Sequence, residues 1–223
     1  MNNLAVVATM TLLAMASPPK VVGTSEPDKK EPISHNQKRW ASAEIRKEKR
    51  HLVEIIANKI LAQEKRYKAV GKKTGVPWYA IAGLHNMESS LSFRHHLHEG
   101  SSLAGRTKYV PKGRPETGNP PFTWEESAED ALRHDSMTTV EWDNLENSLH
   151  RVEAFNGTGY LRYHKDVNSP YVWSYTTEYK RGKYVSDGKW SSTAVSKQCG
   201  VAAIWKVLME KRKCEFPVDY KRY

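Results

Sequence analysis

Segment 76–90 (VPWYAIAGLHNMESS) constrains the fold more than any other part of the chain. Pro77 suits the first position of a helix, where its missing N–H removes no hydrogen bond. Ile81, Leu84 and Glu88 then recur at steps of three and four residues, which places them along one face of a helix. The sequence therefore predicts a helix with a buried face that carries one carboxylate near its end.

The carboxylate of Glu88 is a candidate for acid chemistry. A carboxyl group removed from water keeps its proton at a higher pH than an exposed one. A carboxylic acid that is still protonated near neutral pH can protonate a leaving oxygen, as the cleavage of a glycosidic bond requires. Because a glutamate at the end of an amphipathic helix is more often a solvated boundary residue, spacing alone does not assign this role.

The remaining pattern predicts a mainly α-helical domain with a short β-hairpin or irregular insertion. Segment 92–121 is rich in glycine and proline and is expected to be an ordered loop or hairpin, with a short strand at 107–110. Helical spacing recurs in four other segments: 40–70, 123–134, 140–155 and 194–211. Thr123 and Glu126 have the spacing of a capping box, which indicates that a helix begins there.

The N-terminal part divides into two segments that precede the domain. Residues 4–16 are apolar and end in an A-x-A pattern, so we interpret 1–16 as a signal peptide or N-terminal anchor and expect a secreted or periplasmic protein. Residues 17–38 hold four prolines and many charges and are expected to form a flexible linker. The folded domain is therefore expected to span 39–223.

Four longer motifs suggest a family. They are HNMESSLSF at 85–93, HLHEG at 96–100, PPFTWEESA at 120–128 and FNGTGY at 155–160. Together they resemble the goose-type lysozyme and lytic transglycosylase superfamily, and in particular phage and bacterial lysozyme-family proteins. The last motif is similar to a Tyr-Asn-Ala-Gly motif of that superfamily, with phenylalanine in place of the first aromatic residue. The resemblance covers roughly residues 70–205.

The resemblance implies a lysozyme-like α+β fold and cleavage of the β-1,4 bond between N-acetylmuramic acid and N-acetylglucosamine in peptidoglycan. Glu88 would be the general acid, Ser89 would support the site, and Asn156 and Tyr160 would lie near the bound sugar. No cofactor is needed. A helix-end hydroxyl bonded to its own backbone also explains Ser89, and an Asn-Gly helix cap also explains Asn156. Lytic transglycosylase activity and a non-catalytic glycan-binding module are the alternative functions.

A second carboxylate distinguishes the two enzymatic reactions. An inverting hydrolase needs a base that activates water, with the two carboxyl groups about 6.5–9.5 Å apart. Glu99 is our candidate, because it follows the acid helix and Glu126 is expected to cap another helix. A lytic transglycosylase needs no such base, because a hydroxyl of the sugar closes the ring.

Arginines and aromatic residues are candidates for the wall of a glycan groove. Aromatic faces stack on sugar rings, and arginine pairs with carboxylates of the muramyl or peptide groups. Packing of an irregular region is the alternative role of the aromatic residues. The candidate substrate contacts are Arg106, Thr107, Arg114, Tyr160, Tyr171 and Trp173.

The net charge of +10 favours polyanionic partners, although simple solubility also explains it. A peptidoglycan wall agrees with export, whereas no nucleic-acid-binding motif is visible, so we expect no nucleic-acid partner. No apolar run of about 20 residues occurs, so we expect no membrane span, and we expect a monomer.

Histidines and cysteines near these motifs are not expected to bind metal or to pair. His85 and Glu88 lack the two-histidine spacing of a zinc helix, and the histidines at 95–98 are expected to position their loop by hydrogen bonds. Cys199 and Cys214 would lie roughly 22 Å apart on one straight helix. A disulfide needs Cα atoms within about 7 Å, so we expect two unpaired thiols.

Overall fold

The computed structural model describes residues 36–186 and 188–212, and the structural statements below concern these residues. They form a mainly helical structure with one two-stranded antiparallel sheet, which confirms the expected fold class. The longer helices are α2 (Arg50–Ala62), α3 (Glu64–Thr74), α4 (Trp78–Ser89), α5 (Trp124–His134), α6 (Leu145–Phe155) and α9 (Val201–Arg212). The short elements are α1 (Asn36–Ser42), α7 (Gly159–Tyr163), α8 (Pro170–Trp173), the 3-10 turns η1 (Lys47–Lys49) and η2 (Met137–Thr139), β1 (Lys183–Ser186) and β2 (Lys189–Ser191).

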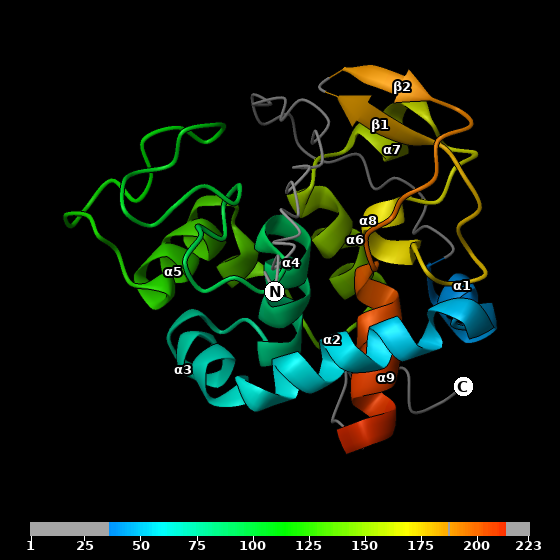
Figure 1. Cartoon of the computed structure of the whole chain (residues 1–223), viewed down its shortest axis with the longest axis horizontal. Coiled ribbons are helices and arrows are strands. Elements are labelled where there is room, and N and C mark those ends of the chain that lie inside the picture. The colour runs from blue at the N-terminus through cyan, green and yellow to red at the C-terminus, as the bar shows by residue number, and fades with distance from the viewer. Residues whose placement is uncertain (1–35, 187, 213–223) are drawn as a thin grey trace, which may run out of the picture.

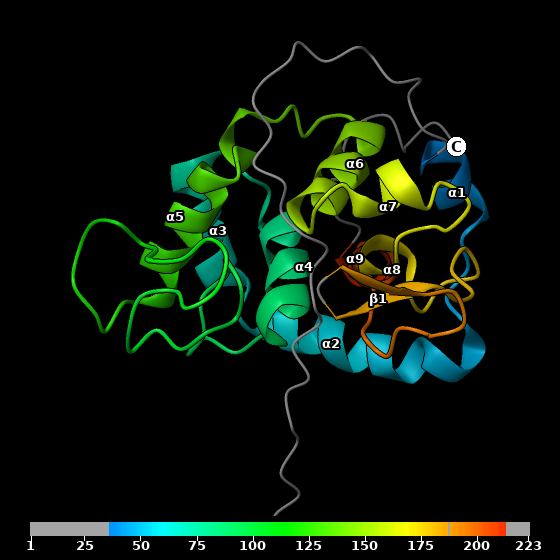
Figure 2. The same cartoon turned by 90° about the horizontal axis from the view of Figure 1, so that it is seen from above.

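Helix α4 runs through the middle of the molecule, with α3 and α5 on one side and α8 and α9 on the other (Figures 1 and 2). All of its residues except Trp78 and Glu88 are buried. The sequence predicted a helix with one buried face, whereas α4 is buried on every side. A helix of this kind lies inside the core. Gly83 allows α9 to approach closely, because an added Cβ would lie 2.9 Å from Val201 Cγ1.

Helix α1 begins at Asn36, inside the segment that was expected to be a flexible linker. The backbone N–H groups of Asn36 and Gln37 donate to the Glu146 carboxylate of α6 at 3.3 and 2.8 Å. The folded part of the chain thus includes residues 36–38, and the expected domain start at 39 was too late. The expected signal peptide, residues 1–16, lies outside the described residues.

A second carboxylate on the same helix, Glu153, is buried without comparable support. Burial raises its pKa from 4.5 to about 7, and the positive charge of Arg39 on α1 opposes this shift. Burial raises the pKa of Tyr160, and the negative charge of Glu153 adds to this shift. Helix α6 therefore carries two different buried carboxylates. Glu146 accepts hydrogen bonds from the backbone, whereas burial disfavours the charged form of Glu153.

Three helix boundaries differ from the sequence prediction. The helical segment 40–70 is divided into α1, α2 and α3, and α2 ends where Gln63 separates it from α3. Helix α6 begins at Leu145 rather than near residue 140. The last helix begins at Val201 rather than near residue 194, because the chain at Gly200 packs directly on the backbone at Val172, where an added Cβ would lie 2.5 Å from the carbonyl oxygen.

The expected strand at 107–110 is wrong, because this segment is a loop. The strands lie instead at 183–191, where Lys183 pairs with Ser191 and Tyr184 with Trp190. The capping box at the start of α5 is confirmed, with reciprocal hydrogen bonds between Thr123 and Glu126.

The remaining predictions concern the cysteines and the membrane. Cys199 precedes α9 and its thiol is free and buried, so the assumption of one straight helix through both cysteines was wrong. Cys214 lies outside the described residues. Within the described part of the chain, every helix is too short or too polar to cross a bilayer.

Candidate active site

Glu88 lies in the last turn of α4, where it is half-buried. The chain reverses directly after the helix, because Ser90 and Leu91 both adopt left-handed backbone conformations, with φ angles of 52° and 62°. Their amides donate to carbonyl groups in the last turn of α4 at 3.1 and 3.2 Å. A left-handed residue other than glycine costs roughly 1–2 kcal/mol, so the surrounding packing must hold this reversal in place.

Tyr171 of α8 contacts the candidate acid directly. Its hydroxyl donates to Glu88 Oε1 at 2.8 Å, and its side chain is only 4% exposed. Burial, followed by the charge of Glu88, raises the pKa of Tyr171 well above the usual value of 10, so the phenol remains a hydrogen-bond donor. Tyr171 therefore orients the carboxylate, whereas the sequence placed it in the wall of a glycan groove.

The loop that follows α4 packs against the backbone of Glu88. Gly100 has a φ of +80°, and an added Cβ would lie 2.5 Å from the carbonyl oxygen of Glu88, so only glycine fits. Glu99 precedes this glycine, in the loop that follows α4. Its carboxylate accepts a hydrogen bond from the Ser101 hydroxyl.

Asp135 is a carboxylate near the site that the sequence did not suggest. It follows the last residue of α5, it is half-buried, and its charge contributes to the raised pKa of Tyr171. Tyr171 thus lies close enough to both Glu88 and Asp135 for their charges to act on its phenol. An aspartate after a helix is ordinary in sequence, so no local pattern identified it.

The segment just before α9 forms hydrogen bonds with the end of α4. Gln198 Nε2 donates to the carbonyl oxygens of Met87 and Asn86 at 2.5 and 3.3 Å, and Asn86 Nδ2 donates to the Cys199 carbonyl oxygen at 3.2 Å. These contacts fix the last turn of α4, which carries Glu88. They join residues more than 110 positions apart, so local periodicity could not reveal them.

Two buried histidines hold the loop after α4 in position. His96 Nδ1 lies 2.8 Å from the Ser127 hydroxyl of α5, and its Nε2 lies 2.8 Å from the Gly105 carbonyl oxygen. His98 Nε2 lies 2.7 Å from Asp130 Oδ2, and burial lowers the pKa of His98 to about 4. Both rings therefore serve as hydrogen-bonding groups within the structure, as the sequence predicted.

His85 has a similar role inside the core. Its Nδ1 lies 3.0 Å from the Tyr67 hydroxyl, and burial lowers the pKa of His85 to about 4. No group of three or more histidine, cysteine, aspartate and glutamate side chains is arranged to hold a metal ion within the described ranges.

Most predicted substrate residues of the loop are used to build it. Thr107 is buried, and its hydroxyl accepts from the Arg114 amide at 2.8 Å and donates to the Pro111 carbonyl oxygen. Arg114 donates to both oxygens of Asp130 at 2.9 and 2.6 Å. Arg106 donates to the Gly118 carbonyl oxygen at 2.8 Å. These contacts tie the loop together and bind it to α5.

We expect Arg114→Ala to lower the free energy of unfolding by about 1–2 kcal/mol and to leave the KM for a glycan substrate unchanged. Charge-assisted hydrogen bonds are worth about 1.5–3 kcal/mol, and partial exposure reduces that value. Urea unfolding measures the first quantity. Lys112→Ala is the matched control, because this exposed lysine of the same loop forms no ion pair within the described chain. Unchanged stability with a raised KM would assign Arg114 to the substrate instead.

The other predicted residues lie in packed positions. The Ser89 hydroxyl is buried and donates to the His85 carbonyl oxygen at 3.4 Å, and Asn156 is the capping residue that follows α6. Tyr160 is buried with its ring edge-on to Tyr184 and Trp190 of the hairpin. Trp173 is buried in the core. The structure therefore brings Glu88 together with Tyr171 and the loop of Glu99, and it uses the remaining aromatic candidates for packing.

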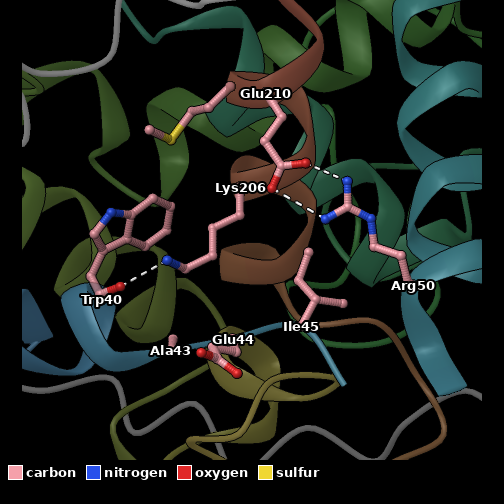
Figure 3. A pocket seen from close by; sticks show the side chains of 8 residues that line it. Trp40, Ala43, Glu44, Ile45, Arg50, Lys206 and Glu210 are labelled. Atoms are coloured by element: carbon pink, nitrogen blue, oxygen red, sulfur yellow. Dashed lines mark hydrogen bonds and ion pairs between the residues drawn. The ribbon is translucent and has the colours of Figure 1, made fainter. Parts of the chain in front are cut away.

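A surface pocket of about 430 Å³ lies between α1, the start of α2 and α9 (Figure 3). Lys206 donates to the Trp40 carbonyl oxygen at 2.8 Å, and Arg50 pairs with Glu210 at the opposite wall. None of the candidate residues lines this pocket. Its cations are already bonded to protein oxygens, so it gives no indication of a catalytic site.

Comparisons with known proteins find no relative of this chain. No protein-family model, no curated protein and no solved structure matches it. The geometry around Glu88 and the sequence motifs are therefore the basis for a functional proposal.

Proposed function

We propose that this protein cleaves the β-1,4 glycosidic bond between N-acetylmuramic acid and N-acetylglucosamine in peptidoglycan, with Glu88 as the general acid. The observation that supports this most is the hydrogen bond of 2.8 Å between the buried Tyr171 hydroxyl and Glu88 Oε1. It orients one carboxylate at the end of a buried helix. The resemblance of the motifs around Glu88 and Asn156 to the goose-type lysozyme and lytic transglycosylase superfamily supports the same activity.

The proposed chemistry begins with a proton transfer. Protonated Glu88 donates its proton to the bridging oxygen while positive charge develops on the sugar ring. Tyr171 holds one oxygen of the carboxyl group, so the group has a fixed direction before substrate binds, and orientation of this kind lowers the barrier. The bond to the leaving sugar then breaks without any cofactor.

Hydrolysis is our first choice for the second step, and non-hydrolytic cleavage by a lytic transglycosylase is the alternative. Hydrolysis requires a carboxylate that activates water, and Glu99 is our first candidate for this base, with Asp135 as the second. In the alternative reaction a hydroxyl of the muramyl sugar attacks and leaves an anhydro ring. We propose a secreted or periplasmic location as part of the same function, because the wall is outside the cytoplasm.

Mass spectrometry of products from purified peptidoglycan tests the proposal. Reducing muropeptide ends would support a hydrolase, and anhydro-muramyl ends would support a lytic transglycosylase. If the folded protein sediments with peptidoglycan but releases no soluble fragment, then a non-catalytic glycan-binding module is the correct class. The absence of both cleavage and binding would contradict the proposal.

Tyr171→Phe is expected to lower kcat about tenfold and to leave KM nearly unchanged. The phenylalanine ring fills the same buried space, while the hydroxyl that orients Glu88 is lost. Steady-state kinetics on soluble peptidoglycan fragments provides both constants. Tyr67→Phe removes another buried phenol that bonds to a core histidine, and it serves as the control for general loss of stability. An unchanged kcat for Tyr171→Phe would show that Glu88 needs no such support.

A further inference from the structure

The loop at 107–114 is held together by several internal hydrogen bonds. Its two ends meet in a hydrogen bond of 2.8 Å from the Thr107 amide to the Arg114 carbonyl oxygen. The Gly113 amide donates to the Thr107 carbonyl oxygen at 3.0 Å, and the Thr107 hydroxyl bonds both to Pro111 and to the Arg114 amide. Thr107 is only 3% exposed, so one buried threonine holds the loop in a single shape.

The base of this loop is fixed to the body of the molecule. Arg114 donates to both oxygens of Asp130 on α5, and Asp130 also accepts from His98. Part of the connection between α4 and α5 extends outward on the side of α5 (Figures 1 and 2). Its tip is therefore held away from the core instead of folding back onto it.

The tip presents an unusual set of side chains to solvent. Tyr109 is 68% exposed and Val110 is 61% exposed, which places them among the most exposed large hydrophobic residues of the described chain. Lys108 and Lys112 flank the pair and are also exposed, and neither forms an ion pair within the described residues. The result is a rigid apolar point between two uncompensated positive charges.

We propose that the tip formed by Lys108, Tyr109, Val110 and Lys112 docks on the surface of an anionic lipid bilayer. Tyrosine is enriched where hydrocarbon meets water, because its ring is apolar and its hydroxyl is polar. Val110 enters the apolar boundary beside it, and the two lysines contact anionic headgroups. Because the loop is already rigid, docking requires little ordering of the chain.

The apolar pair distinguishes a lipid surface from other anionic partners. A soluble polyanion, such as nucleic acid or an anionic wall polymer, attracts the two lysines but offers no apolar layer for Val110. A neutral bilayer offers that layer but does not attract the lysines. Of these three surfaces, an anionic bilayer is the one that matches both parts of the tip, and this argument does not depend on the chemistry of Glu88.

Sedimentation with vesicles tests the proposal on the full chain. The vesicles contain phosphatidylcholine either alone or mixed with phosphatidylglycerol. We expect Tyr109→Ser with Val110→Ser to weaken binding to the anionic vesicles about tenfold, and Lys108→Gln with Lys112→Gln to weaken it about 20-fold and to reduce its salt dependence. The matched control is Tyr163→Ser with Val195→Ser, which removes equally exposed side chains elsewhere and is expected to change nothing.

A second measurement reports on the tip alone, since the apolar residues 4–16 add a background that is common to all variants. An environment-sensitive fluorophore is attached at Tyr109→Cys or at Tyr163→Cys, each combined with Cys214→Ser. We expect a blue shift on anionic vesicles for position 109 and none for position 163. The absence of a shift at 109, or an equal shift at both positions, would overturn the proposal. Binding to heparin that needs the lysines but not the apolar pair would indicate a polyanion site instead.

Discussion

Replacing Glu88 by glutamine is expected to reduce the rate of peptidoglycan cleavage by more than about a hundredfold while the protein remains folded. A general acid contributes about 10²–10⁴ to the rate, and an amide cannot supply the proton at neutral pH. The amide has nearly the same shape, and its oxygen can still accept the hydrogen bond from Tyr171. Release of soluble muropeptides measures the rate, and thermal unfolding measures the stability.

The control for this substitution is Glu125→Gln on α5. This glutamate is partly exposed and pairs with Arg66 of α3. We expect its loss to leave the cleavage rate unchanged. If Glu88→Gln retains more than about a hundredth of wild-type activity, then Glu88 is not the essential acid and another carboxylate near Tyr171, such as Asp135, becomes the candidate.

Glu153→Gln is expected to stabilise the protein above neutral pH by up to about 3 kcal/mol and by less than about 1 kcal/mol near pH 5. The folded protein holds the proton of Glu153 up to about pH 7, whereas the unfolded chain releases it near pH 4.5. Between these values the folded state binds more protons, so the free energy of unfolding falls as the pH rises. Glutamine stays neutral at every pH, so the free energy of unfolding of the variant lacks this decrease.

Urea unfolding of both proteins at pH 5, 6, 7 and 8 measures the effect, and the difference between them cancels the titration of all other groups. The matched control is Glu141→Gln, because Glu141 is exposed just before the same helix. The control is expected to show no pH-dependent difference. A constant difference between Glu153→Gln and wild type across this range would show that Glu153 is charged in the folded state at every pH tested.

The features that the sequence predicted correctly are local. The helix that carries Glu88 follows from apolar spacing after Pro77, and the start of α5 follows from the capping box at Thr123 and Glu126. Each depends on residues within one or two helical turns. Side-chain spacing and backbone capping determine such elements before tertiary contacts form.

The features that the sequence did not predict depend on distant contacts. Tyr171 lies 83 positions from Glu88, so no local pattern indicates that its hydroxyl orients the acid. The late start of α9 results from the close contact of Gly200 with the backbone at Val172, which is likewise a tertiary effect. Arg114 was expected to bind a substrate carboxylate, but it pairs with Asp130 of the next helix, a contact that no local pattern indicates. Sequence reasoning thus identified the candidate acid but not the groups that hold it.

The contacts that close the end of α4 determine when the site can form during synthesis of the chain. Glu88 leaves the ribosome long before Gln198, Cys199 and α9, which complete the packing around its helix. Because domains gain their stability as cooperative units, the last turn of α4 lacks part of its packing until these residues are available. A nascent chain that stops before Gln198 contains Glu88 and Tyr171 but lacks the groups of residues 198–205 that bond to α4. The candidate site therefore gains its full packing only after residues 198–205 have been synthesised, long after Glu88 itself.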